Sequence, residues 1–149
     1  AIEQADPNRE KEIAVILPLH SNNKISATYM DFYSGLLLAA KELNGNYKFN
    51  IIDQSAYKSA EELISKNNLE KADLLIGPIR SSNIGDYLSF ANEHRIPLIS
   101  PLDPSADSLL YKSNFLVQVP VSTAHQDKAL VNWVEQNINS NLNTSVTVI

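Results

Sequence analysis

Short apolar segments that alternate with segments of helical periodicity limit the fold of this chain more than any other feature. The first apolar segment, in residues 12–19, reads IAVILPL and is rich in β-branched residues. Such a run is typical of a strand that is buried on both faces of a sheet. Further strands are expected at residues 49–52, 74–76, 97–99, 115–119 and 146–149.

Segments with helical periodicity separate these strands. Four of them begin near polar residues that cap helices well, namely Thr28, Ser59, Asn83 and Thr123. An acidic residue follows three positions after Thr28 and after Ser59, and each pair is interpreted as a capping box. Tyr87 and Trp133 lie in the apolar stripes of two helices and are expected to pack in the interior. The alternation predicts an α/β fold, a doubly wound parallel sheet with helices on both faces.

Composition excludes several classes of function. The 149 residues suit one domain, and the net charge of -5 argues against nucleic acid or an anionic membrane as partner. No apolar run approaches the ~20 residues of a transmembrane helix. The chain has no cysteine, and its three histidines are too scattered to form a metal-binding pair. Neither a metal nor another cofactor is therefore expected.

The motifs of common α/β enzymes and switches are also missing. A dinucleotide site needs G-x-G-x-x-G after the first strand, but residues 20–23 read His-Ser-Asn-Asn. The sequence contains neither the G-K-[S/T] of a Walker loop nor the G-x-S-x-G of a nucleophile elbow. The acidic residues that a receiver domain needs after its first and third strands are absent as well. We therefore expect a protein that is not an enzyme.

Polar loops follow the predicted strands and indicate a binding site. In an open parallel sheet, ligands bind beyond the carboxyl ends of the strands. The segment DLLIGPIRSS ends the third strand at Gly77-Pro78 and then places an arginine and two serines before a helix, where backbone N–H groups attract anions. The candidate ligand-binding residues on this edge are His20, Ser21, Asn22, Arg80, Ser81, Ser82, Leu102 and Asp103.

Each candidate also has a structural interpretation. One of Ser81, Ser82 and Asn83 is needed as a helix cap, and Arg80 could simply pair with a surface acid. His20 could either be an exposed loop residue or contact the ligand. Asp53, at the end of the second predicted strand, would suit a ligand contact, but it is a lone acidic residue.

Taken in order, these segments resemble the first lobe of type I periplasmic ligand-binding proteins, the leucine/isoleucine/valine-binding and receptor ligand-binding family. The matching segments cover nearly the whole chain after the lead-in: residues 13–19, 31–44, 49–55, 72–83, 91–101 and 115–122. Within the family, the residues at 33–36 and 73–78 most resemble bacterial envelope proteins in which a LysM module precedes this domain. The resemblance implies an exported protein of the periplasm or cell envelope.

The resemblance also implies a ligand in a cleft between two lobes. Ser81 matches the serine that contacts the ligand carboxylate in amino-acid binders, and residues 100–104 match the loop that holds the amino group. Those binders usually have a small residue and then threonine where this chain has Asp103 and Pro104. Because Pro104 has neither an N–H nor a hydroxyl, an amino acid as ligand is in doubt. Asp103 could meet an ammonium group or serve as a turn residue.

The expected organisation is a lead-in at 1–11, a first lobe at 12–122 and the start of a second lobe at 123–149. The last segment would fold back onto the sheet edge or exchange with another copy. Two functions remain open. The first is a solute-binding module for an amino acid, peptide or related ligand, working with an ABC-type permease. The second is an envelope scaffold that binds peptidoglycan or a partner in peptidoglycan synthesis, without a small ligand.

Overall fold

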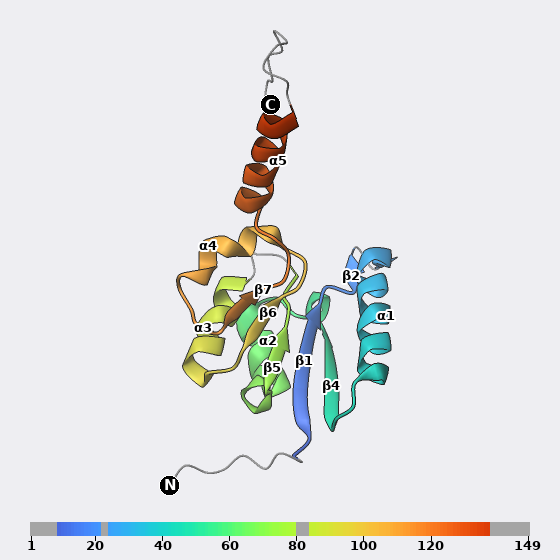
Figure 1. Ribbon diagram of the computed structural model, residues 1–149. Coiled ribbons are helices and arrows are strands. Elements are labelled where there is room, and N and C mark those ends of the chain that lie inside the picture. The colour runs from blue at the N-terminus through green and yellow to red at the C-terminus, as the bar shows by residue number, and fades with distance from the viewer. Residues whose placement is uncertain (1–8, 22–23, 80–83, 138–149) are drawn as a thin grey trace.

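The computed structural model describes residues 9–21, 24–79 and 84–137. Its main sheet has five parallel strands in the order β4-β1-β5-β6-β7 (Figure 1). The strands are β1 Lys11–Leu17, β4 Tyr47–Asp53, β5 Leu74–Ile76, β6 Leu98–Ser100 and β7 Leu116–Gln118. Since β4 joins one side of β1 and the later strands join the other, the sheet is doubly wound, as the sequence predicts.

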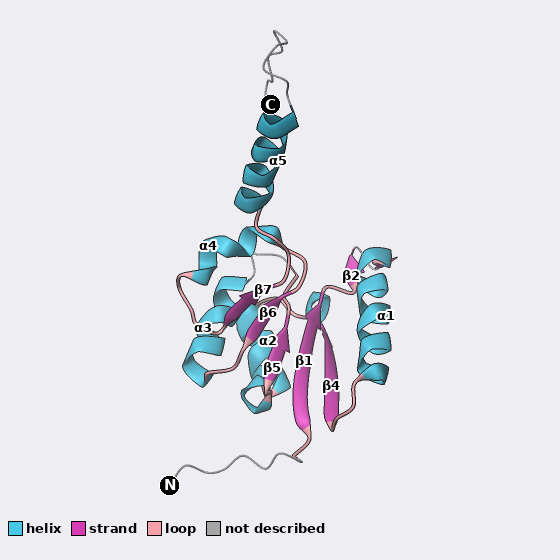
Figure 2. Cartoon of the chain, viewed as in Figure 1, coloured by secondary structure: helices cyan, strands magenta, loops and turns pink. Residues whose placement is uncertain are grey.

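Helices cover both faces of the sheet (Figure 2). On one face lies α1, Ala27–Glu42, whose Phe32 and Leu36 pack against Val15 and Leu17 of β1. The other face is covered by α2 (Ala60–Asn67), α3 (Ile84–His94) and α4 (Asp107–Leu110), and Ile16 of β1 packs among their buried side chains. The remaining helical elements are α5 Thr123–Asn137 and the 3-10 turns η1 Gln54–Ala56, η2 Leu69–Lys71 and η4 Pro104–Ala106.

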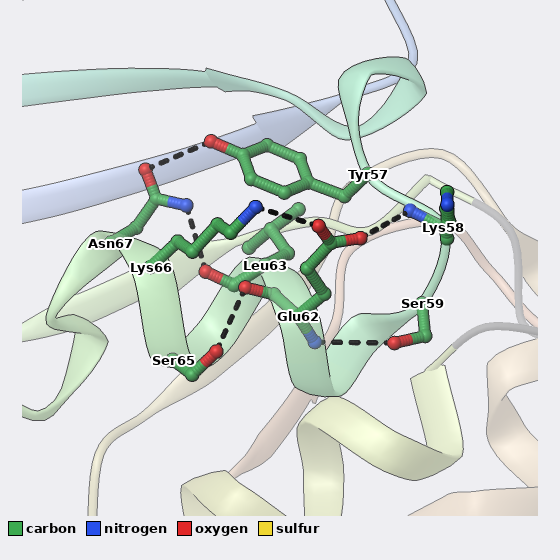
Figure 3. A network of polar contacts seen from close by, with 8 residues as sticks. All are labelled: Tyr57, Lys58, Ser59, Glu62, Leu63, Ser65, Lys66 and Asn67. Carbon is green, nitrogen blue, oxygen red and sulfur yellow. Dashed lines mark hydrogen bonds and ion pairs between the residues drawn. The ribbon is translucent and has the colours of Figure 1, made fainter.

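Several local predictions are confirmed. The hydroxyl of Ser59 accepts the backbone N–H of Glu62 at 3.2 Å and so caps α2 (Figure 3). Tyr87 is wholly buried in the α3 stripe, which it shares with Ile84, Leu88 and Ala91. Asn83, the predicted cap of α3, lies outside the described residues.

The segment before α1 differs from the prediction. A loop was expected from residue 21 to a cap at Thr28, but β2 (His20–Ser21) pairs with β3 (Lys24–Ile25) in a short antiparallel ladder. The N–H of Ser26 then donates to the carbonyl of Leu19 at 2.9 Å. These local bonds fix the chain direction before residue 27, and α1 already begins at Ala27. Its cap residue Ser26 makes no side-chain cap bond.

The last described helix also differs from the prediction. Trp133 of α5 was expected to pack, but it is 63% exposed, and its neighbour Leu130 is 60% exposed. No described residue of α5 is buried, because this helix projects away from the sheet beyond the end of β7 (Figure 1). None of the helices in the described part of the chain is long and apolar enough to cross a membrane.

Candidate functional site

The winding direction of the sheet reverses between β1 and β5, and this reversal positions the candidate site. In doubly wound sheets the ligand crevice opens where two neighbouring strands send their connections to opposite faces. Here α1 follows β1 on one face, whereas α3 follows β5 on the other. The loops that begin at Pro18 and Gly77 therefore lie on either side of the place where this fold class is expected to bind a ligand.

Gly77 allows the β5 loop to pass close to β1. Its φ of +96° is in the region that favours glycine, and its N–H donates to the carbonyl of Ile99 at 2.8 Å. A Cβ at this position would overlap with the backbone carbonyl of Ile16. The glycine thus fixes the start of the loop that leads to residues 80–83.

His20 lies on this edge, and its side chain is bound to Asp53. The His20 Nδ1 atom is 2.5 Å from Oδ2 of Asp53, while Oδ1 of Asp53 accepts N–H bonds from Leu19 and Ser55, both at 3.0 Å. The hydroxyl of Ser55 donates to the His20 carbonyl at 2.6 Å. Burial alone would raise the pKa of Asp53, but the bonds from His20, Ser55 and Leu19 outweigh it and lower this pKa. Asp53 therefore braces the loop after β1 against the end of β4.

Leu102 and Asp103 lie beyond the end of β6, as predicted. Asp103 caps η4 by accepting the N–H of Ser105 at 2.8 Å, and Pro104 is the first residue of that turn. Leu102 is exposed beside it. The geometry therefore agrees with a turn role for Asp103, and it leaves Leu102 accessible on the same edge.

Of the other predicted site residues, the structure places only Ser21. Ser21 belongs to β2, next to His20. Asn22, Arg80, Ser81 and Ser82 lie outside the described residues. The described part of the predicted site thus consists of the loops that hold His20 and Asp103.

Two further polar residues lie on the same edge. Ser100, at the end of β6, is buried, and its hydroxyl has no hydrogen-bond partner among the described residues. Gln118 donates from its amide nitrogen to the carbonyls of Pro104 and Pro120, at 3.2 and 2.8 Å. In the sequence, Ser100 was included only in the loop at 100–104 that the resemblance indicates, and Gln118 was interpreted as part of the strand at 115–119. A polar residue at the carboxyl end of a parallel strand could have singled out Gln118.

A cavity of about 430 Å³ opens between the starts of α2 and α3. Its lining residues are Gln54, Tyr57, Lys58, Ser59, Ala60, Asp86 and Tyr87. None of these residues was a ligand-binding candidate in the sequence, although residues 54–60 directly follow β4 and so belong to a strand-end loop. Within the described ranges, no three histidine or carboxylate side chains come together as a metal site would require.

Comparison with known proteins finds likeness at the level of the fold. No protein-family model and no curated protein matches the chain. Among solved structures, an ABC transporter substrate-binding protein from Desulfitobacterium hafniense matches with a TM-score of 0.67 at 18% identity, over 87% of this chain and 40% of that one. A leucine-binding protein, LivK, from Thermotoga maritima matches with a TM-score of 0.65 at 23% identity, over 85% and 37%.

The branched-chain amino acid transporter substrate-binding protein LivJ from Streptococcus pneumoniae, solved with isoleucine, matches with a TM-score of 0.64 at 20% identity, over 87% of this chain and 39% of that one. The chain thus spans about 40% of the length of the structures that it matches. At these identities the likeness establishes the fold, which is that of a part of these substrate-binding proteins.

Proposed function

We propose that this chain is the first lobe of a non-catalytic solute-binding module, which holds a small polar ligand in the crevice at the carboxyl ends of β1 and β5. The observation that carries the proposal is the reversal of winding at these two strands, with polar loops on both sides. The named functions of the three matched structures agree with it, because all are substrate-binding proteins and two are named for leucine or branched-chain amino acids.

The proposal includes a second lobe that closes over the ligand by hinge motion, with the chain crossing to it near residues 119–122. Half a cleft supplies only some of the contacts that enclose a ligand, so the first lobe alone should bind weakly. The module would act in the periplasm or cell envelope and deliver its ligand to an ABC-type permease. On its own, the lobe would cover the apolar side of α5 by folding it back or by exchange with a second copy.

An envelope scaffold that binds peptidoglycan or a partner in peptidoglycan synthesis is the second candidate. It is favoured by the loop after β6, where Asp103 already accepts a bond from Ser105 and Pro104 offers no N–H. Pro104 also lacks the hydroxyl that could accept an N–H bond from the amino end of an amino acid, and one carboxylate oxygen of Asp103 is already engaged within the turn. In this function the crevice would contain no small ligand.

A thermal-shift screen of a two-lobe protein that contains this chain tests the first candidate. The panel holds amino acids, short peptides, nucleosides and muropeptides. We expect one of these classes to raise the melting temperature, because ligand that binds only the folded state stabilises it. The variants Ser81→Ala and Asp103→Ala should each lower the affinity by roughly tenfold, the loss of about one hydrogen bond.

Matched controls are Ser89→Ala and Asp127→Ala, which remove the same groups from exposed positions on α3 and α5. They should leave the shift unchanged. A screen in which no compound changes the melting temperature would refute solute binding and favour the scaffold. If the control variants lose as much ligand affinity as the site variants, residues 81 and 103 do not form the binding site.

A further inference from the structure

The side chain of Gln118, the last residue of β7, joins the loop after β6 to the loop after β7. Its amide nitrogen donates to the carbonyl of Pro104 in the η4 turn at 3.2 Å and to the carbonyl of Pro120 at 2.8 Å. Backbone carbonyls can only accept, so the nitrogen and not the oxygen of the amide must face them, with one hydrogen for each bond. These two bonds are called the Gln118 clamp below.

The two ends of the Gln118 clamp lie in segments that matter for the proposed function. One end is in the loop that carries two of the predicted ligand-binding residues, because Leu102 and Asp103 directly precede Pro104. The other end is in residues 119–122, the crossing segment, where the proposal places the passage to the second lobe. The clamp therefore connects a candidate ligand loop directly to a candidate hinge.

Apolar packing contributes little to the position of the crossing segment. Its two valines, Val119 and Val121, are 63% and 61% exposed. A cavity of about 550 Å³ lies between α4 and the start of α5, and Gln118 is among its lining residues. Besides the clamp, the Val119 N–H donates to the carbonyl of Ser100 at 3.0 Å. Because few apolar contacts hold this segment, its hydrogen bonds determine how easily it opens.

A residue that only filled space at position 118 would not need an amide group. The Oε1 atom of Gln118 is buried and has no hydrogen-bond partner in the described part of the chain, which is unfavourable. Methionine has a similar length and would fill the same space without an unpaired amide oxygen. What the glutamine adds is its pair of donors to the two loops.

We infer that Gln118 is a positioning residue, which couples the loop after β6 to the crossing segment so that a change in one is transmitted to the other. The inference rests on the proposed function, because it gives the coupling its purpose. A ligand that orders residues 102–104 would hold Pro104 in place and, through Gln118, fix the crossing segment as well. The angle at which the second lobe closes would then depend on whether the crevice is occupied.

Amide hydrogen exchange of the 149-residue chain, measured by NMR without any ligand, tests the coupling. The variant Gln118→Met keeps the length of the side chain but has no donor. We expect the N–H groups of Ser105 and Val119, one near each end of the clamp, to exchange about tenfold faster, the loss of about one hydrogen bond from local stability. The N–H of Leu75, which donates to the Pro97 carbonyl within the sheet, should exchange as before.

The matched control is Gln126→Met, which makes the same chemical change in an exposed residue of α5. The Gln126 amide nitrogen donates to the Val121 carbonyl at 2.7 Å, so this bond joins the crossing segment to α5 and does not reach the loop after β6. The control should leave the exchange of the Ser105 N–H unchanged.

A third variant tests the coupling from the ligand loop while Gln118 stays intact. Asp103→Ala removes the acceptor of the Ser105 N–H and so loosens the η4 turn. Exchange of the Val119 N–H should then become several-fold faster, but Asp103→Ala should add nothing at Val119 once Gln118 is methionine, since coupled residues are not additive.

Three results would overturn the inference: faster exchange throughout the sheet in Gln118→Met, unchanged exchange of Ser105 or Val119 in that variant, or the same effect of Asp103→Ala on Val119 with and without Gln118. Each would leave residue 118 with a packing role only. No ligand takes part in this experiment. A failure of the coupling therefore leaves solute binding to be decided by the thermal-shift screen, and a failed screen leaves the exchange result in place.

Discussion

Asp53 shows how a single side chain links two strand ends. Its carboxylate accepts bonds from His20, Leu19 and Ser55, and these bonds lower its pKa below the ordinary value of 3.8 despite the opposing effect of burial. A carboxyl group with a lowered pKa in the folded state stabilises that state at higher pH. This contribution is fully present above the ordinary pKa and is lost as the pH falls through the lower, folded value.

We therefore expect Asp53→Ala to reduce the free energy of unfolding at pH 7 by about 1–3 kcal/mol, since it leaves Leu19 and Ser55 without their acceptor. The loss should shrink as the pH falls from above the ordinary pKa of 3.8 through the lower folded value, because the carboxyl group then becomes protonated in both states. Urea unfolding at a series of pH values measures this difference. Asp31→Ala, at an exposed site on α1, is the control. A loss that does not depend on pH would contradict the assigned role.

At the scale of elements, two glycines should respond to the same substitution with opposite sign. Gly77 ends β5 with a positive φ and lies against the Ile16 carbonyl, so Gly77→Ala should lower the free energy of unfolding by more than about 1 kcal/mol. Gly35 lies in an exposed part of α1, where a Cβ would meet nothing within 4 Å. Gly35→Ala should raise the free energy of unfolding by about 1 kcal/mol, because alanine favours helix.

Urea unfolding of the two alanine variants beside the unchanged chain measures both effects. Each variant serves as the matched control of the other, because the chemical change is the same. Stabilisation by Gly77→Ala would show that the β5 loop does not pass β1 as described. Destabilisation by Gly35→Ala would show that this part of α1 is covered.

At the scale of the whole molecule, α5 carries an apolar side that the described chain does not cover. Trp133 is the single tryptophan, so its fluorescence reports on this helix alone. At low concentration we expect emission close to that of free tryptophan and ready quenching by iodide. A blue-shifted, shielded emission that does not change on dilution would contradict an α5 that projects from the sheet. A blue shift that grows with concentration would support exchange with a second copy.

Residues 20 and 103 show how far the site could be predicted. Both residues follow apolar runs that were interpreted as strands, so the sequence was enough to predict that they lie at strand ends. The structure confirms those positions, beyond β1 and β6. Their hydrogen-bond partners differ in how far away they lie in the sequence. Asp103 binds Ser105, two positions away, so a turn role could be proposed from the sequence. His20 binds Asp53, 33 positions away, and no local pattern indicates that pair.

The sequence by itself determined the parallel α/β class, the five strands of the main sheet, the cap at Ser59 and the buried stripe of α3. These features depend on periodicity and on bonds within one or two turns, which neighbouring residues specify. The tertiary structure alone decided that β5 lies beside β1, that Asp53 braces the β1 loop, that a cavity opens between α2 and α3, and that Trp133 stays exposed. The physical reason is that each of these depends on which distant segment covers an apolar face or reaches a polar group, and this is settled only when the layers pack together.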